Sequence, residues 1–338
     1  MSPSDNLWAL VLAAGDGRRL QGLTTTGNGL AIPKQFCSLA SGPSLLREAI
    51  ARAAAVAAPE RICAIVAAQH RRWWRDQLDD LDPENLIVQP ENKGTAIGML
   101  LSLVTLIERD PDARILVLPS DHHVRDEARL ARDLRYAAAP SEPEPEPEPE
   151  PAEILLLGLE PAAPDMQLGY IVPRRSFARA HHAVERFVEK PDMARARRLV
   201  EHGALWNTFI IAARAASLLQ LFERRCPEIV SALRAAARGA HGGKGAGEAL
   251  AELYPTLPSL DFSRSILQGQ EQYLRVLPIS DCGWSDLGTP ERVAAALAAL
   301  PRMARNAVRA ANDRDVLLSL AAQSACMRGA QVAAARGG

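Results

Sequence analysis

The residues best suited to chemistry follow the first apolar run of the chain. That run, LWALVLA, leads directly into the loop Gly15–Gly17, and Arg18 and Arg19 come next. Glycines allow backbone N–H groups to approach phosphate oxygens closely, and the arginines add positive charge beside them. Lys34 follows on a segment anchored by a proline, where it can close on the same phosphates. The pattern predicts a phosphate-binding loop, although a Gly-x-Gly after a strand is equally typical of a simple tight turn.

Two common phosphate-binding motifs are absent from this loop. The pattern G-x-x-x-x-G-K-[ST] does not occur, and Leu20 stands where G-x-G-x-x-G requires its third glycine. P-loop kinases and dinucleotide-binding dehydrogenases are therefore disfavoured.

Short apolar runs alternate with helical patterns and are expected to position these residues. The apolar runs lack strict alternation, which is typical of strands buried on both faces of a parallel sheet. Between them lie segments with apolar residues at helical spacing. The predicted strands are Leu7–Ala13, Ile62–Ala67, Leu86–Val88 and Ile115–Leu118, and the predicted helices are Leu45–Ala57 and Ile97–Glu108. This order indicates a doubly wound α/β fold, in which ligands bind at the carboxyl ends of the strands.

A proline-rich segment interrupts this pattern. Residues Glu142–Pro151 are five Glu-Pro repeats, which favour an extended, solvated loop, so we expect disorder over residues 140–152. A second α/β stretch begins with the predicted strand Ile154–Leu159. We expect one main domain over residues 1–293 and a helical, alanine-rich segment over residues 294–338.

Composition argues against several classes of protein. The 338 residues include 39 Lys and Arg and 40 Asp and Glu, so no excess of charge points to a nucleic-acid partner. The five cysteines are scattered without a C-x-x-C pair, which disfavours a zinc site or a disulfide framework. No run approaches the ~20 apolar residues of a membrane helix, and the first apolar run lacks a basic leader. We expect a cytoplasmic protein without a nucleic-acid or membrane partner, and we leave a homodimer open.

The stretch LAAGDGRRL…PKQF resembles the signature of the sugar-phosphate nucleotidyltransferases, most closely that of the mannose-1-phosphate guanylyltransferases, G-x-G-x-R-L…PKQ. Six further blocks follow in the order of that family: QPENKGTA, LPSDHHV, LGYIVP, FVEKP, LWNTF and GWSDLGTPERV. Each block alone is a weak signal, and the ordered set is specific. The resemblance implies a Rossmann-like, doubly wound mixed sheet of the nucleotide-diphospho-sugar transferase type.

The resemblance also implies the chemistry of the site. A sugar-phosphate oxygen attacks the α-phosphate of a nucleoside triphosphate in line, a step catalysed mainly by positioning and charge stabilisation. Arg19 and Lys34 are implied to hold the triphosphate and stabilise the charge on the transferring group. Asp121 and Asp286 are implied to bind Mg²⁺, which prefers oxygen ligands. From the residues alone, Asp121 is equally suited to cap the next helix.

The remaining ligands are assigned by the same resemblance. The nucleotide-binding set is Ala13, Ala14, Gly15, Gly17, Gln89, Asn92, Gly94, Thr95 and Asp121, and the sugar-phosphate set is Gly169, Glu189, Lys190 and Asn207. The block that contains Gln89 and Thr95 also has the pattern of a helix start, with Thr95 as its cap.

Several residues depart from the pattern or carry little signal. The family usually has W-N-S-G where this chain has Asn207-Thr208-Phe209, so a phenyl ring is expected to reshape the sugar pocket. His70 is expected on a helix surface. His122 and its neighbour His123 point in opposite directions on an extended segment, so at most one of them is expected to touch the site.

We therefore expect a Mg²⁺-dependent enzyme that joins GTP and mannose 1-phosphate and releases pyrophosphate. One alternative is the same reaction with glucose 1-phosphate and UTP or dTTP. Another is a non-catalytic regulatory homologue that binds a nucleotide-sugar, against which the presence of Arg19, Lys34, Asp121 and Asp286 argues. A glycosyltransferase is disfavoured because no D-x-D motif ends a predicted strand.

Overall fold

The computed structural model describes residues 6–25, 29–39, 42–139, 154–174, 180–239 and 245–300. Within these residues a mixed sheet has the strand order β3-β2-β1-β4-β8-β5-β9-β7-β6. Its strands are β1 Leu7–Ala13, β2 Ile62–Ala67, β3 Leu86–Gln89, β4 Arg114–Pro119, β5 Ile154–Leu159, β6 Gly169–Arg174, β7 His182–Glu189, β8 Leu205–Arg214 and β9 Leu274–Ile279. The helices are α1 Gln21–Thr24, α2 Leu45–Ala54, α3 Arg71–Trp74, α4 Gly94–Arg109, α5 Glu127–Ala138, α6 Met193–Glu201, α7 Ala215–Arg225, α8 Pro227–Ala237, α9 Ala246–Leu253 and α10 Pro290–Ala299.

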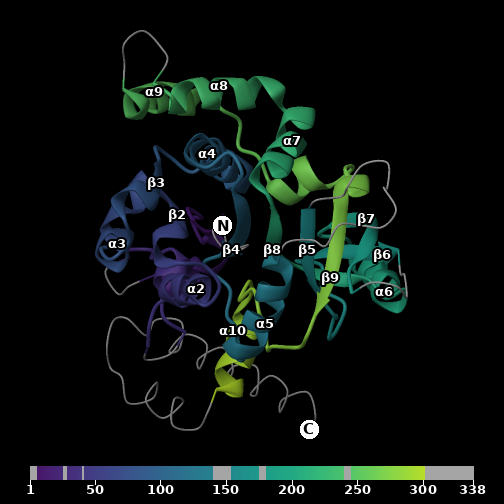
Figure 1. Cartoon of the computed structure of the whole chain (residues 1–338). Helices are drawn as coiled ribbons and strands as arrows, with labels where there is room; N and C mark the ends of the chain where they lie inside the picture. Colours follow the sequence, from purple (N-terminus) through teal and green to yellow (C-terminus); the bar gives the residue numbers. More distant parts are fainter. Residues whose placement is uncertain are drawn as a thin grey trace.

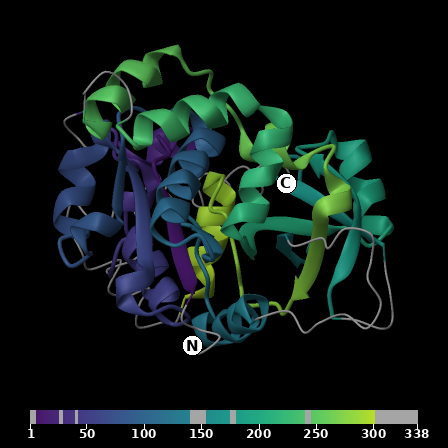
Figure 2. The same cartoon turned by 45° about the horizontal axis from the view of Figure 1, so that its top comes forward.

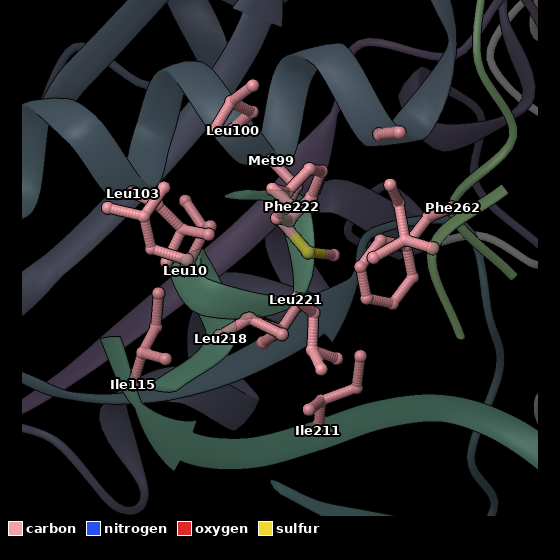
Figure 3. Close-up of a cluster of buried hydrophobic side chains, with 14 of the residues drawn as sticks. Leu10, Met99, Leu100, Leu103, Ile115, Ile211, Leu218, Leu221, Phe222 and Phe262 are labelled. Atoms are coloured by element: carbon pink, nitrogen blue, oxygen red, sulfur yellow. The ribbon is translucent and has the colours of Figure 1, made fainter. Parts of the chain in front are cut away.

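Helices cover both faces of the first half of the sheet. Figure 1 shows α4, α7 and α8 on one side, and α2 and α5 on the other. Successive residues of β1 point to opposite faces of the sheet. Leu10 packs with Met99 and Phe222 on one face, whereas Ala9 and Val11 pack on the other. Figure 3 shows Leu10 and Met99 in the first of these two cores. Burial on both faces explains why the apolar runs of these strands do not alternate.

The predicted fold class is confirmed. Strands β1, β2, β3 and β4 are parallel neighbours, as expected for a doubly wound sheet. The run at Ile154–Leu159 forms β5 with the predicted bounds. The helix predicted from Ile97 begins earlier, at Gly94, and the helix predicted to Ala57 ends at Ala54. Seen in Figure 2, the first half of the chain lies beside the half built from β5–β9.

Strand β8 joins the two halves. Residues Ile211–Arg214 pair with β4, and the beginning of the same strand pairs with β6 through Trp206 and Leu205. Against β5 the register shifts, so that three residues of β8 face the single residue Leu157. Such a bulge bends a strand and re-aims its side chains.

Two of the predicted segments lie partly or wholly outside the described residues. The Glu-Pro segment at 140–152 lies outside them, as does the predicted helical segment beyond residue 300. Helix α10 runs across the boundary expected between residues 293 and 294, and its Val293 is fully buried against Leu20 and Leu45. In the described part of the chain, no helix is long and apolar enough to span a bilayer.

Candidate active site

The loop that follows β1 is shaped by its glycines. Gly17 has a φ of 64°, and a Cβ atom at this position would lie 2.7 Å from the backbone nitrogen of Lys34, so only glycine fits here. At Gly15, by contrast, a Cβ atom would meet nothing within 4 Å. The side-chain amide of Gln35 donates to the carbonyl oxygens of Gly15 at 2.7 Å and of Ala13 at 3.2 Å. The loop is therefore fixed from behind while Gly15 stays open to a ligand.

Asp16 ties the same loop to the segment after β2. Its carboxylate accepts a hydrogen bond from the Gln69 amide at 3.1 Å, lies 3.5 Å from Nε2 of His70, and pairs with the exposed Arg18 at 3.1 Å. The prediction that His70 lies on a helix surface is wrong, because the ring is buried between Asp16 and Phe36. Burial lowers the pKa of His70, which favours the neutral imidazole.

Lys34 lies at the centre of the charged groups. Its side chain is 4% exposed, and Nζ pairs with Oδ2 of Asp121 at 2.8 Å and donates to the carbonyl oxygen of Asp286 at 2.6 Å. Burial would raise the pKa of Asp121, but Lys34, together with His122 and Arg19, outweighs this effect and lowers the pKa to about 2. Asp121 is therefore ionised throughout the physiological range.

The Asp286 carboxylate is buried among arginines. Oδ1 accepts from Nη1 of Arg292 at 2.5 Å and from the backbone nitrogen of Gly288 at 3.1 Å. Nη2 of Arg19 lies 3.9 Å from Oδ2. Sequence reasoning missed Arg292, although it follows Asp286 in the same block, on the first turn of α10. The spacing could have identified it, because an arginine in the first turn of a helix can reach back to the loop before that helix.

A short antiparallel bridge brings the two aspartates together. His123 and Ser285 exchange backbone hydrogen bonds of 2.9 Å, and Asp121 and Asp286 flank this bridge. Asp121 does not cap the next helix, because the Asp126 side chain accepts from the backbone nitrogen of Arg129 and fills that role. The alternative that Asp121 caps the next helix is therefore wrong.

One of the two adjacent histidines faces the site, in line with the prediction. His122 lines the cavity described below, its Nε2 lies 3.6 Å from Asp121, and its ring packs edge-on against Trp284. Burial lowers the pKa of His122 to about 4, against the opposing effect of Asp121, so this imidazole is neutral at pH 7. His123 points the other way, toward Glu48 of α2 at 3.7 Å.

A cavity of about 230 Å³ opens where β1 and β4 end and α4 begins. Seven of the nine predicted nucleotide ligands line it: Ala14, Gly15, Gly17, Asn92, Gly94, Thr95 and Asp121. The other two are fully buried behind its wall. Ala13 contributes its carbonyl to Gln35, and Gln89 accepts from the Tyr254 hydroxyl at 3.3 Å.

The N-terminus of α4 forms one wall of this cavity. Asn92 accepts a hydrogen bond from the backbone nitrogen of Gly94 at 2.9 Å. Gly94 has a φ of 84°, and a Cβ atom there would lie 2.4 Å from the carbonyl oxygen of Leu260, so glycine is required. Thr95 was expected to cap the helix, but it lies inside α4, whose first residue is Gly94. The Gly94 N–H is bonded to Asn92 and the Ala96 N–H to the carbonyl oxygen of Leu260, but the positive end of the helix dipole still favours an anionic ligand here.

The predicted sugar ligands gather on the second half of the sheet. Gly169 and Glu189 are opposite each other in β6 and β7. A Cβ atom on Gly169 would lie 2.6 Å from Oε2 of Glu189 and 3.4 Å from Cβ of Asn207, so the glycine makes room for both side chains. Lys190 binds the buried Glu189 carboxylate through its Nζ. These four residues do not line the cavity themselves, but Phe209, two residues after Asn207, does.

The chemistry of the donors suits Mg²⁺. In the part of the chain that the structure describes, no group of three or more His, Cys, Asp or Glu side chains is arranged to hold a metal ion. Asp121, however, lines the cavity with 37% of its side chain exposed, and Asp286 lies across the bridge from it. Two carboxylates completed by water and phosphate oxygens are a common Mg²⁺ environment. Lys34 and Arg292 now neutralise these carboxylates, so a metal ion would compete with them for the same oxygens.

Comparisons with known proteins identify the family of the chain. The family model described as nucleotidyl transferase matches residues 8–302. The chain is 29% identical over 283 residues to the xanthan biosynthesis protein XanB of Xanthomonas campestris pv. campestris (strain ATCC 33913), covering 83% of this chain and 57% of that protein. It is 26% identical over 287 residues to a mannose-1-phosphate guanylyltransferase of Sinorhizobium fredii, covering 84% of this chain and 53% of the relative. The chain thus spans a little over half the length of these relatives.

Solved structures give the same picture. A protein described as a mannose-1-phosphate geranyltransferase from Thermus thermophilus superposes with a TM-score of 0.70 at 28% identity, over 88% of this chain and 80% of that one. A UDP-glucose pyrophosphorylase in complex with UDP-glucose shares the fold, with a TM-score of 0.54 at 13% identity over 85% of this chain and 96% of the other. The match to the family model covers most of the chain and includes the phosphate loop, both aspartates and the predicted sugar ligands. The chain belongs to the nucleotidyl transferase family.

Proposed function

We propose that this chain transfers a nucleotidyl group from GTP to mannose 1-phosphate, forming GDP-mannose and pyrophosphate in the cytoplasm. The observation that carries the proposal is the buried Lys34 ammonium, held between the Asp286 carbonyl and Asp121, which lines the cavity. A cation fixed in this way stabilises negative charge on a transferring phosphoryl group without reorganising. The names of the relatives, among them mannose-1-phosphate guanylyltransferases of Sinorhizobium fredii and Klebsiella pneumoniae, support the choice of substrates.

Each part of the site has a role in this reaction. The N–H groups of the loop at Gly15–Gly17 and the N-terminus of α4 bind the nucleotide, and Arg19 binds the departing phosphates. Asp121 and Asp286 would hold Mg²⁺, which when bound neutralises charge on the phosphate oxygens. Glu189 and Asn207 bind the sugar hydroxyls, and Lys190 binds the sugar phosphate as a point charge.

No acid–base relay is required for this step. The attacking phosphate oxygen already carries negative charge, and pyrophosphate is a good leaving group, so the enzyme has to align the two reactants in line and stabilise charge. The neutral His122 and the buried Cys282 are therefore assigned no proton transfer and no covalent intermediate. Burial raises the pKa of the Cys282 thiol to about 11, which makes it a poor nucleophile at pH 7.

The proposal is tested by pyrophosphate release in the presence of Mg²⁺ with four nucleoside triphosphates and the 1-phosphates of mannose, glucose and N-acetylglucosamine. We expect the highest kcat/KM with GTP and mannose 1-phosphate. Asp121→Asn should abolish turnover, whereas the matched variant Asp126→Asn, at the exposed cap of α5, should retain it because asparagine also caps helices. Turnover with another pair would change the assigned substrates, and no turnover with any pair would refute the enzymatic function.

A further inference from the structure

Phe209 has an unusual backbone conformation for an aromatic residue. Among the described residues, Phe209 has a φ of 62°, in the left-handed region, as do the non-glycine residues Lys190 and Leu287 at 48° and 46°. All three lie within two residues of a predicted ligand, namely Asn207, Glu189 and Asp286. Left-handed geometry is costly for a bulky side chain and persists only where the surroundings enforce it. Such strain is concentrated at functional sites.

Side chains of β8 hold Phe209 in this conformation. Its backbone nitrogen donates to Oδ1 of Asn207 at 3.1 Å. The neighbouring Thr208 hydroxyl donates to the carbonyl oxygen of Leu157 at 2.6 Å and accepts from the backbone nitrogen of Ile210 at 3.3 Å. The bulge in β8 is thus fixed by hydrogen bonds on both sides of Phe209. Because the carbonyl of the Asn207 amide is taken by the backbone, its NH₂ group remains to donate to a ligand.

The Phe209 ring packs against the core on one side of the cavity. It lines the cavity and packs edge-on against Phe262, with ring centroids 5.8 Å apart. Phe262 in turn packs against Phe222 at 5.7 Å, and Figure 3 shows these two rings within the core cluster. Two residues before Phe262, the backbone of Leu260 is hydrogen-bonded to the start of α4, accepting from Ala96 at 3.1 Å. The ring therefore has a set position relative to the nucleotide wall of the cavity.

We propose that Phe209 determines which sugar 1-phosphates the site accepts. Its ring lines the cavity two residues after Asn207 and packs against Phe262, and it admits a hexose whose ring carbons carry only hydroxyl groups. A hexose with an N-acetylamino group in place of one hydroxyl is excluded, since the ring occupies the room that the extra atoms need. This inference rests on the proposed function and adds the residue that selects the sugar.

The test compares sugar selection in wild type and two variants. Phe209→Gly removes the aromatic ring from the cavity and relieves the strain of the left-handed backbone conformation at this position. We expect it to shift the ratio of kcat/KM for N-acetylglucosamine 1-phosphate over mannose 1-phosphate upward by about tenfold or more, with unchanged GTP affinity. Phe222→Leu is the matched control, because it removes an aromatic ring from the same stack but leaves Phe209 at the cavity. It should leave the ratio unchanged.

Each outcome decides the proposal. An unchanged ratio in folded Phe209→Gly, or an equal shift in Phe222→Leu, overturns it. If Phe209→Gly does not fold, Phe209→Asn takes its place, since asparagine tolerates left-handed geometry. If the wild type turns over no pair, the proposed function fails. Calorimetric titration of the wild type and the variant with the two sugar 1-phosphates then tests the role of Phe209 in sugar selection independently of turnover. A gain of affinity for N-acetylglucosamine 1-phosphate in the variant then supports the role of Phe209, and no gain refutes it.

Discussion

At the scale of single residues, two neighbouring arginines differ in their partners. The Arg18 side chain is 81% exposed and pairs with Asp16, whereas Arg19 is 53% exposed and reaches the buried Asp286. An exposed ion pair contributes little, so Arg18→Met should change kcat/KM by less than about fivefold. Arg19→Met removes a cation from the place where phosphate charge develops and should lower kcat/KM by about 100-fold. Steady-state kinetics of the two variants checks this, and equal losses would contradict it.

The pair of Lys34 and Asp121 predicts a dependence of stability on pH. The pKa of Asp121 is lowered from 3.8 to about 2, so the folded state binds its proton less readily than the unfolded state does. The pair therefore stabilises the protein fully above about pH 4, and this contribution is lost as the pH falls from about 4 toward 2.

Asp121→Asn should accordingly lower the free energy of unfolding by about 1–3 kcal/mol at pH 7, because it leaves the buried Lys34 without its counter-ion. The difference in the free energy of unfolding between the variant and the wild type should be smaller at pH 3. Urea unfolding at pH 7, 5 and 3 measures this difference. A difference that stays constant across these values would show that Asp121 is not held ionised by Lys34.

At the scale of elements, two glycines of the site are required for different reasons. Gly94 begins α4 with a φ of 84° and has Leu260 directly against it, so Gly94→Ala should lower the free energy of unfolding by about 2 kcal/mol or more. Gly15 has open space beside it, so Gly15→Ala should leave stability within about 0.5 kcal/mol but weaken nucleotide binding. Chemical denaturation and nucleotide titration of both variants separate the two roles. Equal destabilisation would contradict the assignment.

Elements whose pattern is local could be predicted from the sequence, and residues placed by distant contacts could not. Strand β1 and the loop after it are encoded in one continuous stretch, which is why Gly15 and Gly17 were found. The burial of His70 depends on Asp16 and Phe36, which are distant in the chain, so its helical neighbourhood suggested the wrong surface position. The left-handed Phe209 likewise follows from a bulge that only the pairing of β5 with β8 creates.

At the scale of the whole molecule, one continuous sheet connects the proposed nucleotide end to the proposed sugar end. Strand β8 pairs with β4 on one side and with β5 and β6 on the other. A single core cluster includes Leu10 of the first half as well as Phe187 and Val276 of the second. Elements that share both a sheet and a core are expected to unfold together.

Thermal unfolding of the described fold should therefore be a single transition. A ligand that binds at either end of the sheet should raise the midpoint temperature of that whole transition. If GDP-mannose with Mg²⁺ is the bound product, as proposed, then at about 100 times its Kd it should stabilise the native state by about 2.7 kcal/mol, a shift on the order of 5 °C for a chain of this size. Differential scanning calorimetry with and without the ligand measures both quantities. Two transitions, of which only one moved with ligand, would mean that β8 does not couple the halves. The site would then have to assemble from independently folding parts, which the shared core argues against.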